Sequence, residues 1–582
     1  MKYEKLVEVY EDIEKTSKRL QITKLIADLF KKTSADDLGM IALLLQGRLF
    51  PASDERKIGV ASQMAIKALT IATGISKDAV VKEWKKKGDL GLVAEELVKK
   101  KKQRTLLSST SLTVKKVFEN LQKLVEMGGA GSVDRKLKLI AELLSAAKPL
   151  EAKYIIKTVL EELRLGVGEG SIRDAIVWAF FAKEVGLKYD SKSHKASYNE
   201  EYKNYIKAVR NAFDLTNDFG QVAKLAKTKG LKGLKKTKLV LGTPIKVMLG
   251  PKEDSVAEAM DRVGKPAAIE PKFDGFRLQI HKVGNDVKLF TRRLDNVSAA
   301  FPEVVKYAKE CIKAKECLLD SEAVGFDAKT GKYRPFQEIS QRIKRKHNID
   351  QLVKKLPVEV NVFDIIYYNG KDLLNEPFEK RREILKKILH SKKKKFVIVP
   401  QITTSDEKKA EKYYHDALDI GHEGVMFKNL KSPYKPGARV GHMVKFKPVM
   451  EPFEVVIVGA EWGTGKRSGW LTSYNIACRD DGEFKELGKV STGLKEKKEE
   501  GLSFGEMTKI LKALVTKERG RHVTVDPQIV IEVAFGEIQK SPTYSSGYAL
   551  RFPRITRLRE DRGPNDCTTL DEVKAAYKKQ KK

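Results

Sequence analysis

At 582 residues the chain is too long for one hydrophobic core, which excludes a single-domain protein and predicts about three or four domains. It carries 113 Lys and Arg against 78 Asp and Glu, and this formal net charge of +35 favours a polyanionic partner, most simply nucleic acid. Heat adaptation is the alternative explanation of so charged a surface, but it does not account for the imbalance between the two signs.

Cysteine spacing and hydropathy restrict the class further. The four cysteines are Cys311, Cys317, Cys478 and Cys567. None forms a CxxC pair, so we expect neither a zinc site nor a disulfide framework, and a reducing compartment fits. The stretch Met1-Lys-Tyr-Glu-Lys5 lacks an apolar signal core, and no run of about 18 apolar residues occurs. We therefore expect a soluble, cytoplasmic protein without a membrane partner.

Helical periodicity dominates residues 1–235. Leu6, Tyr10 and Ile13 form one apolar stripe, and Leu25 and Leu29 belong to another. Strand-like alternation is scarce in this part of the chain. The pattern predicts an all-α domain over residues 1–235.

A glycine-rich stretch, residues 163–171, joins two of the predicted helices. Glycines at such a junction let backbone amides and a helix N-terminus approach a phosphate, and two arginines lie alongside. The predicted phosphate contacts are Arg164, Gly166, Gly168 and Arg173. An ordinary helix–helix turn remains the alternative, since spacing alone does not separate the two.

A second stretch in the helical part follows the lysine run at residues 99–102. Gln103 stands shortly before the apolar pair Leu106 and Leu107. A charge run is usually a solvated loop, but a glutamine followed by paired apolar residues can also dock into the groove of a partner. Both readings stay open on the residues alone.

Glycines and lysines at residues 230–242 mark a domain boundary, and the composition changes after it. Short apolar strands then alternate with helices, with strands expected at residues 287–290, 317–325, 358–367, 397–402 and 424–427. This pattern predicts an α+β domain over residues 241–447. Beyond it, short strands between glycine turns predict an all-β barrel of the OB type over residues 448–582, with a basic helix at its end.

One stretch of the α+β domain combines groups that suit nucleophilic chemistry: Glu270-Pro-Lys272-Phe-Asp274-Gly275-Phe-Arg277. Its glycine allows the backbone to approach another group closely. The stretch reads as a turn that leads into a strand, because apolar residues alternate after it. An amine beside other cations loses its proton more readily, so Lys272 could act as a nucleophile. By itself this is weak evidence, since most such lysines are solvated loop residues.

Further polar groups follow Lys272 along the predicted strands. Asp320 and Glu322 stand on an apolar strand, where a buried acid needs a cation, a metal or a ribose hydroxyl as partner. Phe363 offers a ring on which a base can stack. Lys445 and Lys447 alternate, which aims both side chains to one side. Each feature alone is more often structural, but their order after Lys272 is informative.

In this order the series resembles the covalent nucleotidyltransferase superfamily, and specifically the ATP-dependent DNA ligases of the archaeal type. The stretch around Lys272 is similar to the first motif of that family. The stretches similar to the later motifs are Thr291-Arg292-Arg293, Asp320-Ser-Glu322, Phe363-Asp364, Glu423-Gly-Val, Lys445-Phe-Lys447 and Arg551 to Arg562. The resemblance covers nearly the whole chain.

The resemblance implies a multidomain fold: an all-α DNA-binding domain, an ATP-grasp-like α+β adenylation domain and an all-β OB-fold domain that together encircle nicked duplex DNA. It implies three steps, in which Lys272 takes AMP from ATP, AMP passes to the 5′-phosphate at a nick, and the 3′-hydroxyl displaces it. The implied setting is DNA replication, recombination, repair and cell division.

The resemblance also implies residue roles. Lys272 would be the nucleophile, Glu270 would contact adenine and Phe363 would stack on it. Glu322 would hold the ribose and, with Glu423, a Mg²⁺ ion, for which Mn²⁺ is an alternative. The residues that would surround ribose and phosphates are Arg277, Arg292, Arg439, Lys445 and Lys447; those that would orient pyrophosphate are Arg559, Asp561 and Arg562.

This sequence departs from the family pattern at three places. Met443 replaces the usual aromatic residue two positions before Lys445, and Arg562 replaces a final lysine, which changes the geometry of its charge. Residues 103–107 lie where relatives carry a sliding-clamp box, but with leucines in place of aromatics. We expect a monomer that can bind a clamp through Gln103, Leu106 and Leu107.

Two alternatives remain at this stage, and a third, an NAD-dependent ligase, is excluded. An RNA ligase or mRNA-capping guanylyltransferase shares the lysine chemistry, but it does not account for the large helical domain. An NAD-dependent ligase would carry a four-cysteine zinc module that these cysteines cannot make. A non-catalytic DNA-binding protein would explain the charge, but it assigns no role to Lys272.

Overall fold

The computed structural model describes residues 1–51, 54, 56–100, 111–129, 131–343, 345, 348–448, 450–463, 467–496, 499 and 501–580. The chain forms two compact units that interleave along the sequence. The first comprises Met1–Pro251, Asp274–Val399 and Asn429–His442, and the second comprises Lys252–Phe273, Pro400–Lys428 and Met443–Lys582. Among the described residues, no helix is long and apolar enough to cross a membrane.

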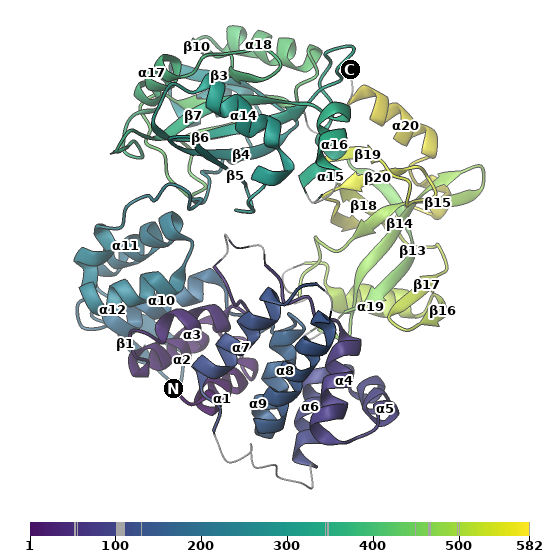
Figure 1. The fold of residues 1–582 in the computed structure, drawn as a ribbon. Helices are drawn as coiled ribbons and strands as arrows, with labels where there is room; N and C mark the ends of the chain where they lie inside the picture. Colours follow the sequence, from purple (N-terminus) through teal and green to yellow (C-terminus); the bar gives the residue numbers. More distant parts are fainter. Residues whose placement is uncertain are drawn as a thin grey trace. The chain divides into compact units, whose positions relative to one another are not determined.

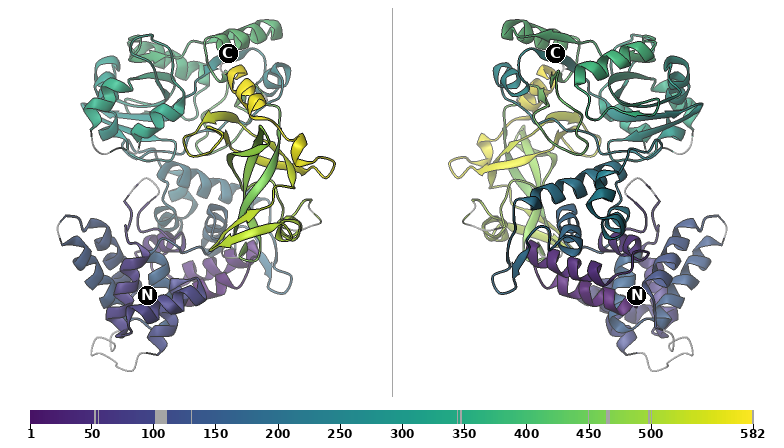
Figure 2. Two further views of the ribbon diagram at one scale, coloured as in Figure 1. Left: turned by 90° about the vertical axis from the view of Figure 1, so that its right-hand side faces the viewer. Right: turned by 90° about the vertical axis from the view of Figure 1, so that its left-hand side faces the viewer.

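The amino-terminal part of the first unit is helical, which confirms the prediction from periodicity (Figures 1 and 2, purple to blue). Its apolar stripes meet in one core that contains Tyr10, Phe30 and Trp178. The hairpin of β1 (Lys188–Asp190) and β2 (Lys195–Ser197) was not predicted. The helices are α1 (Tyr3–Glu14), α2 (Arg19–Lys32), α3 (Leu38–Leu45), α4 (Ser62–Thr73), α5 (Lys77–Lys87), α6 (Leu90–Lys99), α7 (Val114–Glu126), α8 (Ser132–Ala146), α9 (Pro149–Val159), α10 (Glu169–Phe180), α11 (Glu201–Thr216) and α12 (Phe219–Lys235).

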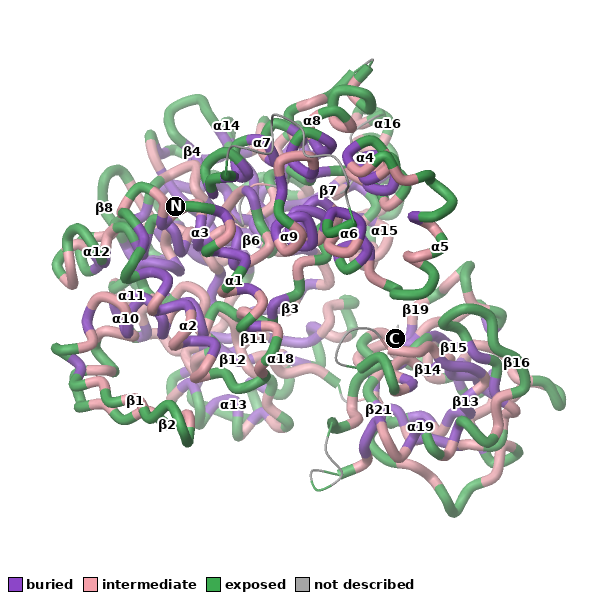
Figure 3. Tube along the Cα trace, turned by 90° about the horizontal axis from the view of Figure 1, so that it is seen from below, coloured by how far each residue is buried: buried purple, intermediate pink, exposed green. Residues whose placement is uncertain are grey.

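The rest of the first unit is a sheet with the strand order β5-β4-β6-β7-β8, in which β9 pairs in parallel with β7. Leu278 and Ile280 of β4 face its apolar core, so Arg277, Gln279 and His281 share the opposite face. Buried residues line β6 and β7 (Figure 3). The strands are β4 (Phe276–Val283), β5 (Asp286–Thr291), β6 (Glu316–Gly325), β7 (Val358–Tyr368), β8 (Lys371–Asp372) and β9 (Phe396–Ile398); the helices are α14 (Pro302–Cys311), α15 (Phe336–Ile343), α16 (Ile349–Lys355) and α17 (Phe378–Ile388).

The second unit contains a four-stranded sheet with the order β10-β3-β11-β12. Ile269 and Val425 pack with residues of two helices in the core on one face, which leaves Glu270, Lys272 and Lys428 on the other face. The strands are β3 (Ala267–Lys272), β10 (Ile402–Thr404), β11 (Gly424–Asn429) and β12 (Met443–Phe446); the helices are α13 (Val256–Val263) and α18 (Glu407–Asp419).

The strand expected at residues 397–402 is two strands in the structure. β9 ends at Ile398 in the six-stranded sheet, and β10 begins at Ile402 in the four-stranded sheet. Pro400 lies between them and has no N–H to donate to a ladder, so one continuous strand could not pass through it. The single apolar run therefore serves two sheets.

The carboxyl-terminal part of the second unit is rich in strands and ends in a helix, as the sequence predicted. β13 pairs with β14, β17 and β18, and the apolar core includes Val455, Ile476 and Ile531. The strands are β13 (Phe453–Trp462), β14 (Leu471–Asp480), β15 (Glu483–Val490), β16 (Val515–Arg519), β17 (His522–Val525), β18 (Val530–Ala534), β19 (Glu537–Lys540), β20 (Tyr548–Arg551) and β21 (Arg554–Leu558); the helices are α19 (Phe504–Lys512) and α20 (Leu570–Lys579).

Two helices of the first unit approach each other through glycine, and this contact can be tested. A Cβ on Gly220 of α12 would lie 2.5 Å from Cα of Gly39 in α3. We expect Gly220→Ala to destabilise the protein by about 1–3 kcal/mol, because the two backbones must separate. A Cβ on Gly39 has nothing within 4 Å, so Gly39→Ala is the matched control and should leave stability unchanged or raise it by up to about 1 kcal/mol. Thermal unfolding measures both, and equal Tm values would contradict the close approach.

Candidate active site

Lys272 ends β3, and its ammonium group is paired with the carboxylate of Glu423. The backbone N–H of Glu423 also donates to the carbonyl oxygen of Lys272, over 2.8 Å. Nζ of Lys447 lies 2.7 Å from the other carboxylate oxygen of Glu423. One carboxylate of the second unit therefore bridges two lysines.

Glycine at position 424 allows this arrangement. Its φ of 144° is unfavourable for other residues, and a Cβ there would collide with the carbonyl oxygen of Phe446. The start of β11 can therefore lie against the end of β12, the strand with which it pairs in antiparallel register. This approach brings Glu423 beside Lys447.

The two ammonium groups determine the protonation of Glu423. Burial raises the pKa of this carboxyl group, but the charges of Lys272 and Lys447 outweigh burial and lower the pKa from 4.5 to about 2. Glu423 is therefore ionised at neutral pH and binds both cations. With Glu322, it is one of the two residues for which the resemblance implied a metal-binding role.

A second ion pair lies on the same face of this sheet. Nζ of Lys428 is 2.5 Å from a carboxylate oxygen of Glu270, and the side chains are only 7% and 3% exposed. Lys445 also belongs to this face, because it pairs with Met426 across β11 and β12, while Met443 pairs with Lys428. No role for Lys428 was predicted from the sequence.

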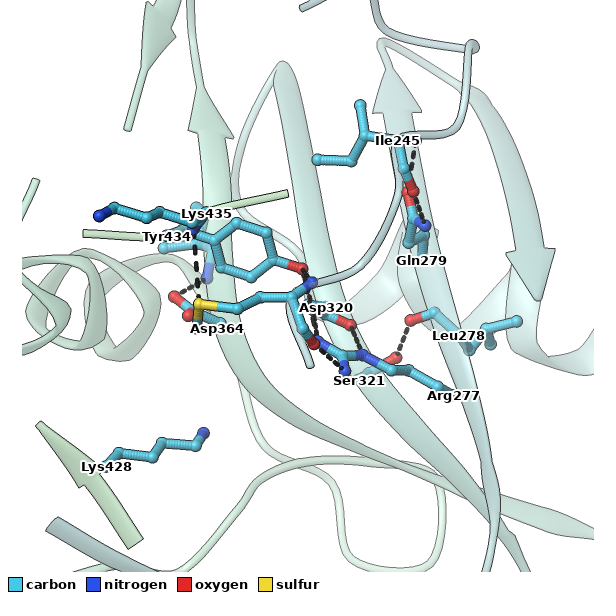
Figure 4. Close-up of polar contacts among 12 residues, drawn as sticks. Ile245, Arg277, Leu278, Gln279, Asp320, Ser321, Asp364, Lys428, Tyr434 and Lys435 are labelled. Carbon is cyan, nitrogen blue, oxygen red and sulfur yellow. Dashed lines mark hydrogen bonds and ion pairs between the residues drawn. The ribbon is translucent and has the colours of Figure 1, made fainter. Parts of the chain in front are cut away.

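Arg277 is held by a buried acid in the first unit (Figure 4). Its Nε lies 2.9 Å from Oδ1 of Asp320 and its Nη2 lies 2.6 Å from Oδ2, a two-bond pair in which Asp320 is fully buried. Nη1 donates to the carbonyl oxygen of Met248 over 2.7 Å. Burial lowers the pKa of Arg277, but the charge of Asp320 more than reverses this, so the pKa lies above its usual value. Of the three partners expected for a buried acid (a cation, a metal or a ribose hydroxyl), Asp320 has a cation in the structure.

Phe363 contacts Arg277, and Gly275 lies against β6. Cζ of Arg277 lies 5.3 Å from the ring centroid of Phe363, within the range of a cation–π contact. A Cβ on Gly275 would collide with the carbonyl oxygen of Ala323 on β6 and lie 3.0 Å from Cγ of Glu322. The predicted close backbone approach at Gly275 is therefore present, and it lies beside Glu322.

Positive charge accumulates around Arg292, which follows β5. Burial lowers the pKa of Arg292, and the charges of Arg277 and Arg439 lower it further, while Glu322 acts in the opposite direction. These guanidinium groups are near enough to repel one another. Such a surplus of positive charge suits a phosphate, which would relieve the repulsion.

The last predicted motif forms a cluster of its own after β21. Nε of Arg559 lies 2.8 Å from Oδ1 of Asp561, and Arg559 is also paired with Glu454 of β13. Nε of Arg562 lies 3.7 Å from Glu454. The structure thus pairs Arg559 with Asp561 and brings both arginines to Glu454, for which no role was predicted from the sequence.

The predicted DNA-contact turn lies between α9 and α10. Gly166 has a φ of 71°, and Gly168 is the residue before the first turn of α10. Nη2 of Arg173 lies 2.6 Å from Asp174, so its charge is partly engaged within the helix. Arg164 lies in the connecting segment before Gly166. The geometry has the glycine-dependent bend that the sequence predicted.

Two other expectations concern a clamp-binding segment and a metal ion. Gln103, Leu106 and Leu107 lie outside the described residues. Within the described residues, no group of three or more His, Cys, Asp or Glu side chains is arranged to hold a metal ion. A Mg²⁺ ion usually takes one or two carboxylates together with substrate phosphates and water, so its binding does not require a preformed group of three side chains.

The pKa of Glu423 leads to a test in acid. A carboxyl group whose pKa is lowered in the folded state stabilises that state above its ordinary pKa, and this contribution is lost as the pH falls through the folded pKa. The window here runs from about pH 4.5 to about pH 2. We expect the difference in urea midpoint between the protein and Glu423→Gln to narrow across this window. A constant difference would contradict the lowered pKa.

Comparison with known proteins identifies the family of this chain. Residues 247–447 match the model of the ATP dependent DNA ligase domain, residues 2–177 that of the DNA ligase N terminus, and residues 467–562 that of the ATP dependent DNA ligase C terminal region. The chain is 46% identical to the DNA ligase of Nanoarchaeum equitans and 40% identical to that of Thermococcus onnurineus, covering 100% of this chain and 99% of each relative. The solved structure Pmar-Lig_PreS3 shares the fold, with a TM-score of 0.54 at 17% identity over 95% of this chain and 99% of that one. The chain therefore belongs to the ATP-dependent DNA ligase family.

Proposed function

We propose that the protein is an ATP-dependent DNA ligase that seals nicks in duplex DNA through AMP bound covalently to Lys272. The observation that carries the proposal is the bridge from Glu423 to Lys272 and Lys447, which holds an amine at the end of a strand. Relatives named DNA ligase match the whole chain. The same activity would serve DNA replication, recombination, repair and cell division.

In the first step, Nζ of Lys272 attacks the α-phosphorus of ATP. A phosphorus–nitrogen bond forms, the bond from that phosphorus to the bridging oxygen breaks, and pyrophosphate leaves. Nζ must release a proton to become nucleophilic, and the attack then requires positioning and charge neutralisation more than further covalent help. Lys447 shares the carboxylate with Lys272, so Glu423 keeps a cation when the amine turns towards phosphorus.

In the later steps, the bound AMP passes to DNA. A 5′-phosphate oxygen at the nick attacks the AMP phosphorus, and the bond to Nζ of Lys272 breaks. The 3′-hydroxyl then attacks the 5′-phosphorus, loses its proton and releases AMP. These displacements develop negative charge on phosphate oxygens, which cationic side chains stabilise.

We propose nucleotide-binding roles for residues of each unit, as the resemblance implies them. In the second unit Glu270 would contact adenine, and Lys445 and Lys447 would bind phosphates. In the first unit Phe363 would stack on the base, Glu322 would hold the ribose, and the arginines would bind ribose and phosphates; these arginines are Arg277, Arg292 and Arg439. The lowered pKa of Arg292 supports the phosphate role, because an anion would offset the repulsion among these groups.

We propose the three-domain organisation implied by the resemblance: a DNA-binding domain at 1–235, an adenylation domain at 241–447 and an OB-fold domain at 448–582. Arg559, Asp561 and Arg562 of the last domain would orient pyrophosphate as it leaves. Their ion pairs with one another and with Glu454 support a preformed group. Movement of this domain between steps would let DNA replace pyrophosphate.

Nicked duplex DNA is the proposed partner of a monomer. Arg164, Gly166, Gly168 and Arg173 would contact the phosphate backbone, and the net charge of +35 supports binding that is salt-dependent and insensitive to sequence. A sliding clamp that binds Gln103, Leu106 and Leu107 stays a prediction of the sequence.

The central test replaces the nucleophile. Lys272→Ala should lose covalent AMP below detection while binding to nicked duplex stays within about twofold, because DNA affinity rests on many phosphate contacts. The measurement is denaturing electrophoresis after incubation with α-labelled ATP, with mass spectrometry of the labelled peptide. Lys265→Ala changes a lysine shortly before β3 that is paired with Glu407, and it is the matched control.

The same assay separates the alternatives. A capping enzyme would take label from GTP rather than from ATP, and a non-catalytic DNA-binding protein would take label from neither. Label on a peptide without Lys272 would contradict the assigned nucleophile.

Removal of divalent metal should stop the first step. Because the described residues form no three-ligand metal group, we expect Mg²⁺ to bind together with ATP, where it offsets phosphate charge and polarises the reacting phosphorus. EDTA should abolish lysyl-AMP formation, and Mg²⁺ or Mn²⁺ should restore it. Elemental analysis after dialysis should find no metal on the ATP-free protein, and stoichiometric metal would contradict this view.

A further inference from the structure

Residues 242–248 (the strap) connect the helical part of the first unit to its sheet, and three side chains of β4 bind the strap. Nδ1 of His281 accepts from the N–H of Gly242 over 3.0 Å. Gln279 accepts from the N–H of Ile245 over 3.0 Å and donates to its carbonyl oxygen over 2.6 Å. Arg277 donates to Met248. Because these side chains alternate along β4, they form a ladder on one face that replaces a regular backbone ladder.

The helical part binds the strap from α11 and α10. Nδ2 of Asn217 donates to the carbonyl oxygen of Pro244 over 2.7 Å, and the N–H of Lys246 donates to the carbonyl oxygen of Asp214 over 3.2 Å. Nζ of Lys246 lies 2.5 Å from a carboxylate oxygen of Glu169, in the first turn of α10. The strap is thus fixed both by the helical part and by the strand that carries Arg277.

Tyr434 joins the end of the strap to the Arg277–Asp320 pair (Figure 4). Its hydroxyl accepts from the N–H of Met248 over 3.1 Å and donates to Oδ2 of Asp320 over 2.7 Å. The Tyr434 side chain is nearly fully buried. Its loop is fixed in turn by Arg381, which donates to the carbonyl oxygen of Ser432 over 3.2 Å.

We propose that Tyr434 is a positioning residue for ATP: it fixes Arg277 through Asp320, and the strap makes this position depend on how the helical part is held. The proposal rests on the assignment of Arg277 to the nucleotide. Oδ2 of Asp320 takes two donors, one from Arg277 and one from Tyr434. Without the hydroxyl, Oδ2 keeps one of these donors and the N–H of Met248 loses its acceptor. Nη2 of Arg277 also loses the hydroxyl oxygen as a second acceptor, 3.4 Å away. The guanidinium then has fewer constraints on its orientation over Phe363.

The first experiment is Tyr434→Phe, which removes only the hydroxyl oxygen. We expect KM for ATP in lysyl-AMP formation without DNA to rise about tenfold, which corresponds to about 1.4 kcal/mol, because the hydrogen bond from Tyr434 that orients Asp320 is lost. kcat at saturating ATP should change less than about twofold, since Lys272 and Glu423 are untouched. A purely structural defect would lower the active fraction and leave KM unchanged.

A matched control removes the same group elsewhere. Tyr474 is fully buried in the strand-rich part, and its hydroxyl donates to the carbonyl oxygen of Leu471 over 2.5 Å. Tyr474→Phe should leave KM for ATP unchanged. If Tyr434→Phe also leaves KM within about twofold of the unaltered protein, the positioning role is wrong.

The second experiment tests the link to the helical part. Asn217 has a left-handed φ of 52°, so Asn217→Gly keeps the backbone conformation and removes the bond to Pro244. We expect KM for ATP to rise, by less than in Tyr434→Phe. In the double variant, the rise in KM should be smaller than the product of the two single rises, because both substitutions remove hydrogen bonds of the same strap. Independent, multiplying effects, or no effect of Asn217→Gly, would overturn the link.

Arg277→Ala separates this proposal from the site assignment on which it rests. If Arg277→Ala raises KM for ATP and Tyr434→Phe does not, the positioning role fails while the assignment of Arg277 stands. If Arg277→Ala leaves KM unchanged, the assignment of Arg277 to ATP fails, and the positioning role fails with it.

Discussion

Glu423 lies between the ammonium groups of Lys272 and Lys447, and this half-buried carboxylate keeps its charge because both cations are close. An isolated carboxylate in that place would take up a proton more readily, since burial disfavours the charged form. Two lysines without the carboxylate would repel each other at the end of the sheet. The three groups therefore form one unit with a net positive charge, which suits an amine that must meet a triphosphate.

The sequence predicted the local parts of this site because they follow from short-range pattern. The alternation of apolar residues after Lys272 indicated β4 and placed Leu278 and Ile280 in the core. The same alternation implies that Arg277 lies on the opposite face. A glycine between a lysine and an arginine indicated a close backbone approach, and Gly275 lies against Ala323. Asp320 on an apolar strand required a partner, and Arg277 is that partner.

Partners distant in sequence could not be predicted in the same way. Met248 and Tyr434 are 186 positions apart, and neither belongs to a periodic pattern. The strap has no helix or regular strand, and its partners, among them the side chains of Gln279 and Asn217, are identified only once the chain is folded. Pro400 was visible in the sequence, but the surrounding apolar run still read as one strand, because the division between two sheets is a property of topology.

Buried ion pairs recur in both units, as Arg277–Asp320 and Arg381–Asp364 in the first and as Lys428–Glu270 in the second. Such pairs add little net stability, because the cost of removing both charges from water offsets their attraction. A hydrophobic pair of similar volume would therefore serve the core equally well. What a hydrophobic pair lacks is direction: Asp320 accepts from defined atoms of Arg277 and Tyr434, and this fixes a guanidinium that packing alone would leave free to turn. We infer that these ion pairs orient charged groups at the residues proposed to bind ATP and contribute little to the stability of the core.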